Sequence, residues 1–161
     1  MDSVETALLE SAADTGATIE RHARDKDATD LELALDAAIA RGAVRIVVVG
    51  GGGGRLDHLL ANAALLADER YSRVTVEWFV DDYLVAVVRG SFSIAGAADD
   101  VVTLLAVGGP VTVTATGLRW PLDAEELTPG STRGVSNRLT ADEAAISVDS
   151  GTVLVLHRRA R

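Results

Sequence analysis

The arrangement of hydrophobic residues changes about halfway along the chain, and this change constrains the fold more than any other feature. Before residue 81, helical stripes at 31–39 and 56–66 alternate with runs of apolar, mostly β-branched residues at 44–49 and 74–78. The continuous run at 44–49 is typical of a strand buried on both faces. Because strands that alternate with helices usually lie parallel, residues 1–80 predict a partial Rossmann-like sheet with helices on its faces.

Beyond residues 81–82 the helical period disappears, and short strand-like segments follow one another. They lie at 83–88, 92–94, 101–106, 111–116, 144–148 and 153–156, and turn signals containing glycine occur at 89–90, 108–109 and 150–151. Hairpin-like spacing of this kind predicts a small β-sandwich. The expected fold class is therefore α/β plus all-β, with a first domain over residues 1–80 and a second over residues 81–161.

Composition excludes several classes of protein. Lys and Arg number 15 against 24 Asp and Glu, and the formal net charge of −9 argues against general nucleic-acid binding. Cysteine is absent, which excludes disulfide frameworks, thiolate nucleophiles and cysteine-based zinc sites. The sequence shows neither an apolar run long enough to span a membrane nor a basic-then-apolar leader, so a soluble cytoplasmic protein is the expectation.

Consecutive glycines, Gly50 to Gly54, connect a predicted strand to a predicted helix. Backbone N–H groups in such a turn can approach an anion, and the helix N-terminus adds partial positive charge. The run is neither a Walker A loop, which ends in Gly-Lys-Ser/Thr, nor a dinucleotide fingerprint, because Arg55 replaces its last glycine. A ligand-contacting turn and a merely flexible one both fit the pattern. Asp57 can likewise be only a helix-dipole partner, and His58 is interpreted as a surface residue.

Residues 24–32 combine acidic side chains with a helix start. Thr29 and Glu32 have the spacing of a capping box. Asp27 and Asp30 lie close by, near the predicted carboxyl edge of the parallel sheet, where open α/β sheets bind their ligands. Carboxylates at that edge suit Mg²⁺ better than they suit phosphate. The pattern leaves a helix cap and a magnesium site open as alternatives.

The β-rich half contains two further stretches of interest, residues 117–122 and 130–137. Trp120 lies in a turn before Pro121, where its indole can either fill the core of the sandwich or serve as a stacking surface for a ring. The second stretch is rich in Ser, Thr and Asn, which by itself is ordinary turn chemistry. The three histidines are too scattered along the chain to predict a zinc site.

Taken in order, five segments of the sequence resemble the landmarks of the thiamine pyrophosphokinase family. They lie at residues 1–4, 26–30, 53–58, 117–122 and 130–137. Each motif alone is weak, but the five together follow the family's order and spacing. The resemblance begins in the middle of the first landmark, Gly-Asp-x-Asp-Ser, with Met1 at its x position, so the first aspartate of that pair is missing. We interpret Met1 as an internal methionine of a longer protein; a shortened protein is the alternative.

The resemblance implies a reaction in which a diphosphate group passes from ATP to the hydroxyl of thiamine, leaving AMP. It assigns Mg²⁺ binding to Asp2 and Asp30, catalysis to Asp2, Asp30, Arg55 and Asp57, ATP binding to Lys26, Asp27, Thr29, Gly53, Gly54 and Arg55, and thiamine binding to Trp120, Ser136 and Asn137. It also implies a homodimer in which thiamine lies between the α/β domain of one subunit and the β domain of its partner.

Two other hypotheses stay open. One is a non-catalytic dimer that binds thiamine or a nucleotide; the other is a sheet-edge interaction module without a ligand. A parallel sheet that lacks its opening strands would expose a hydrophobic edge and face, which predicts an association site. Thiamine binding without Mg·ATP binding would favour the first hypothesis. Behaviour that is insensitive to charge reversal at Asp30 would favour the second.

Overall fold

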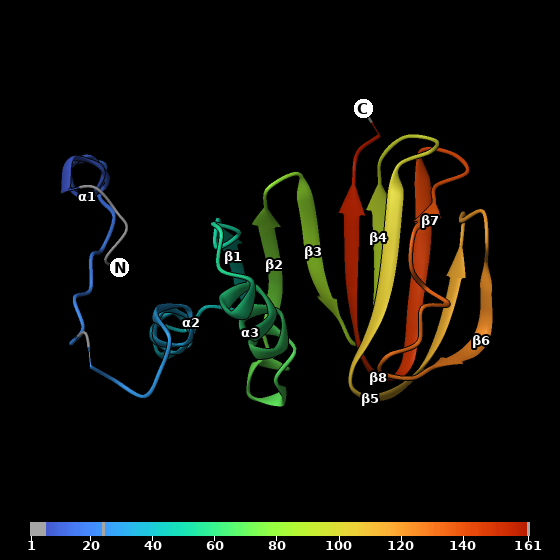
Figure 1. Cartoon of the computed structure of the whole chain (residues 1–161), viewed down its shortest axis with the longest axis horizontal. Helices are drawn as coiled ribbons and strands as arrows, with labels where there is room; N and C mark the ends of the chain where they lie inside the picture. The colour runs from blue at the N-terminus through green and yellow to red at the C-terminus, as the bar shows by residue number, and fades with distance from the viewer. Residues whose placement is uncertain (1–5, 24, 161) are drawn as a thin grey trace. The chain divides into compact units, whose positions relative to one another are not determined.

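The computed structural model describes residues 6–23 and 25–160, and Asp2 lies outside these ranges. By their internal contacts, residues 1–37 and 38–161 form two compact units. The first contains helix α1 (Thr6–Asp14) and the start of helix α2 (Asp30–Ala40) (Figure 1). The Thr29 hydroxyl accepts a hydrogen bond from the backbone N–H of Glu32 over 3.2 Å. This contact confirms that Thr29 caps α2, as the capping-box spacing predicts.

The second unit begins with a strand–helix–strand arrangement. Strand β1 (Arg45–Val49) is followed by the glycine turn, helix α3 (Leu56–Leu66), a short 3₁₀ helix η1 (Glu69–Tyr71) and strand β2 (Thr75–Val80). The strands β1 and β2 are parallel, with Val49 opposite Phe79. The predicted parallel pair is therefore confirmed, and the carboxyl ends of both strands meet at one edge.

The remaining strands continue the same sheet. They are β3 (Tyr83–Val88), β4 (Ser91–Ala95), β5 (Val101–Thr116), β6 (Leu122–Leu127), β7 (Asn137–Arg138) and β8 (Glu143–Arg158). The sheet has eight strands in the order β1-β2-β3-β8-β5-β6, with β4 paired to β8 and β7 paired to β5. The fold is thus a mixed sheet with few helices, in which β3 joins the predicted α/β part to the β-rich part. The sandwich arrangement stays a prediction.

Two long strands replace four predicted short ones. The turn signals Gly108-Gly109 and Ser150-Gly151 lie instead inside β5 and β8, where Gly108 and Gly151 have φ values of 79° and 84°. The register between β5 and β8 shifts between Val107 and Thr112 but continues on both sides. A Cβ at Gly151 would lie 2.8 Å from the Pro110 carbonyl oxygen. The glycines therefore mark an irregularity where two strands approach closely, which is a second use of left-handed glycine beside the hairpin turn.

The largest hydrophobic core belongs to the β-rich part. It is built from β3, β4, β5, β6 and β8 with the connecting residues Leu118 and Leu139, and its most deeply buried members include Val102, Val113 and Val153. At the other end of the strand order, Val47 and Val49 of β1 are 47% and 79% exposed, so β1 is not buried on both faces as its continuous apolar run predicts. None of the described helices is both long and apolar enough to cross a membrane.

Candidate functional site

The glycine turn lies at the carboxyl edge of the parallel pair. Gly50 donates its N–H to the Phe79 carbonyl over 2.9 Å, and its own carbonyl accepts the indole N–H of Trp78 over 2.6 Å. Gly50, Gly51 and Gly54 have φ values of 90°, 82° and 80°, in the region that glycine tolerates best. Gly53 has open space around the position that a Cβ would occupy. The turn is therefore held at its start by β2 and is open further along.

Helix α3 begins with a charged pair next to the glycines. Arg55 donates to both carboxylate oxygens of Asp57, from Nε over 3.2 Å and from a terminal nitrogen over 2.5 Å. This pairing lowers the pKa of Asp57 to about 2, so its carboxylate is ionised at neutral pH. Both side chains are exposed, at 66% and 64%, as is His58. The site thus presents a cation and an anion to solvent beside backbone that can approach a ligand.

The first unit contains the second group of predicted site residues. Lys26 donates a hydrogen bond to the carboxylate of Asp30, at the first turn of α2, and this contact is the main cause that lowers the pKa of Asp30 to about 2. Asp27 is exposed, and Thr29 is the helix cap. Asp30 therefore offers ionised oxygen, whereas the Thr29 hydroxyl already serves the backbone. Because Asp2 is outside the described residues, its predicted role stays a prediction.

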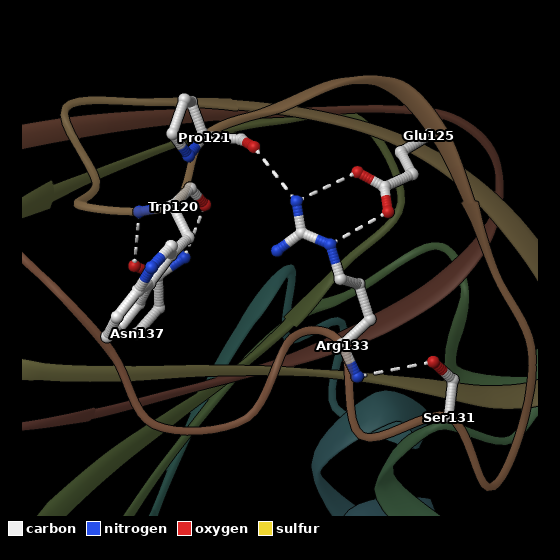
Figure 2. A network of polar contacts seen from close by, with 6 residues as sticks. All are labelled: Trp120, Pro121, Glu125, Ser131, Arg133 and Asn137. Atoms are coloured by element: carbon white, nitrogen blue, oxygen red, sulfur yellow. Dashed lines mark hydrogen bonds and ion pairs between the residues drawn. The ribbon is translucent and has the colours of Figure 1, made fainter.

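Trp120 is held in place by a buried amide. Its backbone N–H donates to Asn137 Oδ1 over 3.1 Å, and its carbonyl accepts from Asn137 Nδ2 over 2.6 Å (Figure 2). The Asn137 side chain is buried, whereas Trp120 itself is 49% exposed. Arg119 lies over the indole, 5.8 Å from the ring centroid. Of the two alternatives for Trp120, the structure therefore supports an accessible ring rather than a buried core residue.

Arg133 makes a second set of contacts that support the Trp120 surface. No role was predicted for this residue from the sequence. Arg133 donates to both carboxylate oxygens of Glu125, over 2.9 and 3.1 Å, and to the Pro121 carbonyl over 3.3 Å (Figure 2). Ser136 is exposed, has a φ of 58° and donates its backbone N–H to Thr103 Oγ1 over 3.0 Å. An arginine within a Ser/Thr/Asn-rich turn was the available signal, since such a side chain can tie a loop to its neighbours.

The two predicted site regions of the second unit stand apart in the sheet. The glycine turn follows β1 at one end of the strand order, and the Trp120 loop connects β5 to β6 at the other end. Three strands, β2, β3 and β8, lie between them in that order. Within the described part of the chain, no group of three or more His, Asp or Glu side chains could hold a metal ion. Each region thus supplies a partial site of its own.

Family models match both halves of the chain. The model described as "Thiamin pyrophosphokinase, catalytic domain" matches residues 1–77, and the one described as "Thiamin pyrophosphokinase, vitamin B1 binding domain" matches residues 93–153. Among curated proteins, the chain is 27% identical to thiamine pyrophosphokinase 1 of rice (Oryza sativa subsp. japonica) over 99% of its length, and 28% identical to thiamine pyrophosphokinase of Bacillus subtilis (strain 168) over 82%. The matches span 64% and 63% of these relatives.

Solved structures agree with this result. The crystal structure of thiamin pyrophosphokinase from Geobacillus thermodenitrificans matches with a TM-score of 0.74 and 27% identity, over 99% of this chain and 74% of that one. Thiamine pyrophosphokinase from Bacillus subtilis matches with a TM-score of 0.81 over 100% of this chain and 77% of that one, at 23% identity. The second similarity concerns the fold alone.

Proposed function

This chain belongs to the thiamin pyrophosphokinase family, and from that premise we propose that it transfers a diphosphate group from Mg·ATP to thiamine. In this reaction, the thiamine hydroxyl oxygen bonds to the β-phosphorus of ATP, the bond between that phosphorus and the α–β bridging oxygen breaks, and the hydroxyl proton is released. The products are thiamine diphosphate and AMP. The observation that carries the proposal is the match of a catalytic and a vitamin-binding family model to successive halves of one chain.

The glycine turn and the start of α3 would bind the triphosphate. Gly53 and Gly54 allow close approach of backbone N–H groups to phosphate oxygens, and the N-terminus of α3 adds partial positive charge. Arg55 would contact the group being transferred, while Asp57 keeps the guanidinium oriented through two hydrogen bonds. The family resemblance also assigns nucleotide binding to Lys26, Asp27 and Thr29. Catalysis of this kind depends on positioning and charge neutralisation.

The donors present fit a magnesium ion that arrives with ATP. Mg²⁺ prefers ionised oxygen ligands and commonly takes one or two carboxylates besides phosphate oxygens and water. Asp30, with its pKa lowered by Lys26, provides such a carboxylate, and the family resemblance assigns Asp2 to the same role. The bound ion would neutralise charge that develops on the phosphates. By the family resemblance, Asp30 and Asp2 would hold it.

The Trp120 surface would bind thiamine. Its half-exposed indole offers a face to the cationic thiazolium ring of thiamine. Ser136 is exposed close in sequence to Asn137 and would contact the ligand directly. Asn137 was expected to contact thiamine, but its buried amide already binds Trp120 through both its oxygen and its nitrogen. In the proposed site Asn137 therefore acts by positioning Trp120.

A homodimer would unite the two partial sites. The glycine turn and Trp120 lie at opposite ends of the strand order, so a complete site would combine one subunit's α/β part with its partner's β part. Mixing the inactive variants Asp57→Asn and Trp120→Ala tests this arrangement. Random exchange of subunits would restore about a quarter of the wild-type activity, because half of the dimers are mixed and each has one intact site. Activity that stays at the level of the single variants would contradict a shared site.

The catalytic proposal is tested by AMP formation. We expect the 161-residue chain with Mg·ATP to release AMP only when thiamine is present, and to lose this activity on Asp57→Asn substitution. Isothermal titration should show separate binding of thiamine and of Mg·ATP. Thiamine binding without AMP formation and without Mg·ATP binding would favour the alternative of a non-catalytic thiamine-binding dimer. The cytoplasmic location stays a prediction.

A further inference from the structure

Asp81 lies where the structure brings the glycine turn and the end of β2 together. Strands β1 and β2 are parallel, so the turn that follows β1 and the residue that follows β2 share one edge of the sheet. Both carboxylate oxygens of Asp81 are 2.8 Å from the position that a Cβ would occupy on Gly52. Any larger residue at position 52 would therefore meet this carboxylate, whose contact with the turn depends on the glycine.

The carboxylate of Asp81 has no protein partner in the described part of the chain. Its neighbour Asp82 differs, because an oxygen of that residue lies 3.9 Å from a terminal nitrogen of Arg158. Asp81 is exposed and is the first residue of the two-residue turn between β2 and β3, with a φ of 51°. Glycine and asparagine adopt that backbone conformation readily, so the turn alone does not require a negative charge.

The chemistry of the position favours hydroxyl groups as the ligand. A carboxylate repels phosphate, so Asp81 is unsuited to the phosphate groups that the glycine turn would bind. A carboxylate accepts hydrogen bonds only, and adjacent ribose hydroxyls are paired donors at a short distance from the phosphates of a nucleotide. In nucleotide-binding strand–helix–strand units, an acidic residue near the end of the second strand accepts hydrogen bonds from ribose hydroxyls. The unit β1–α3–β2 followed by Asp81 has that layout.

We propose that Asp81 accepts hydrogen bonds from the ribose hydroxyls of the nucleotide and makes the site selective for ribonucleotides. This inference rests on the proposed function, since it requires a nucleotide at the glycine turn. It adds a residue outside the five sequence segments that carry the family resemblance. Asp81 would thus determine which sugar is accepted, while the glycine turn and Arg55 bind the phosphates.

Binding of Mg·ATP and of Mg·2′-deoxy-ATP, measured by isothermal titration to the full chain, tests the proposal. The wild type should bind Mg·ATP about tenfold more tightly, the usual value of one hydrogen bond to a charged group. Asp81→Asn should weaken Mg·ATP binding about tenfold and binding of the deoxy nucleotide less, because the deoxy nucleotide retains only its 3′-hydroxyl as a donor to Asp81. Asparagine suits the left-handed backbone, so the turn should be preserved, as a matched unfolding curve would show. Asp82→Asn, the control, should retain the discrimination between the two nucleotides.

Two results would overturn the inference and point to different faults. Equal binding of the two nucleotides by the wild type, or unchanged discrimination in Asp81→Asn, would show that Asp81 does not contact the sugar, while the proposed function would stand. Absence of Mg·ATP binding by the wild type, with thiamine still bound, would overturn the proposed function and this inference together. Inorganic tripolyphosphate provides a sugar-free probe: Asp81→Asn should bind it at least as tightly as the wild type, because the substitution removes a negative charge beside the turn, and a loss here would indicate a general effect on the glycine turn.

Discussion

The glycine turn and the Trp120 loop are held in place by different kinds of contact. At Trp120, a nearly inaccessible side chain, Asn137, binds the backbone of an accessible one through two hydrogen bonds. At the glycine turn, the charged side chains Arg55 and Asp57 are exposed and bind mainly each other. The first region is therefore organised by the protein core before any ligand arrives. The second depends on backbone shape, and its charged groups can be reoriented by a ligand.

Alanine at a glycine should have very different effects in the two regions. At Gly134, a Cβ would lie 2.3 Å from the Leu104 carbonyl oxygen, which belongs to the backbone and cannot move aside. We expect Gly134→Ala to lower the free energy of unfolding by about 3 kcal/mol. Gly53→Ala, with open space around it, should change it by less than about 0.5 kcal/mol. Urea unfolding curves measure both, and equal losses would contradict the comparison.

Removing the buried amide should have the next largest effect. Asn137→Ala leaves the Trp120 backbone N–H and carbonyl without these partners, and should lower the free energy of unfolding by about 2 kcal/mol. Thiamine affinity, measured by titration calorimetry, should fall as well because the indole is no longer oriented. Asn137→Asp retains the acceptor for the Trp120 N–H but places a buried carboxylate oxygen against the Trp120 carbonyl oxygen, so it should lower the unfolding free energy at least as much as Asn137→Ala.

Two aspartates, Asp100 and Asp57, should differ in how strongly they make the stability of the protein depend on pH. Burial raises the pKa of Asp100, but hydrogen bonds from the Ala160 N–H, His157 and the Ala97 N–H outweigh it, and the pKa is lowered. A lowered folded-state pKa stabilises the protein above the unfolded value of about 3.9, and this contribution is lost as the pH falls through the folded value. Asp100→Asn should therefore cost about 1–2 kcal/mol at pH 7.

Stability measured between pH 7 and pH 2 checks this prediction. The wild type should lose stability below pH 4 more steeply than Asp100→Asn, because the variant no longer has the ionised group. Asp57→Asn should leave the curve nearly parallel to that of the wild type, because the Asp57 carboxylate is exposed despite its low pKa. If the stability of Asp100→Asn falls with decreasing pH as steeply as that of the wild type, the acid sensitivity comes from other groups.

The smallest effect on stability is expected at the exposed ring itself. Trp120→Phe leaves the backbone hydrogen bonds to Asn137 in place and removes only part of a half-exposed side chain. The free energy of unfolding should change by less than about 0.5 kcal/mol. Thiamine affinity should nevertheless fall several-fold, because phenylalanine attracts a cation less strongly than tryptophan. Unchanged affinity, measured under the same conditions, would remove Trp120 from the proposed binding surface.

Local signals were sufficient for several elements of this fold. The β-branched run, the glycines after it and the helical stripe predicted β1, the turn and α3, and Thr29 with its spacing to Glu32 predicted the cap of α2. Each of these depends on residues close together in the chain. Gly108 misled the prediction because a left-handed glycine serves a strand irregularity as well as a hairpin turn.

Contacts between distant residues could not be predicted in the same way. Asn137 binds a residue 17 positions away, and His157 binds Asp100 across 57 positions, so no spacing pattern indicates either pair. The same limit applies to Asp81, because no pattern in the sequence indicates that it lies against Gly52. The roles of Asp30, Arg55, Asp57 and Trp120 came from the family resemblance. The structure shows how each is held, while their roles in catalysis and binding stay predictions.

Strand β8 has a consequence for how the protein would be degraded. One part of it pairs with β3, another with β4, and both parts pair with β5. Removing β8 would therefore break a pairing of three strands at once, and β4 would be left without a hydrogen-bonded neighbour. A protease that cleaves only unfolded protein would therefore find no partly unfolded intermediate in which one half of the sheet stays folded. Residues 38–161 should consequently resist digestion as a single piece or be lost as one.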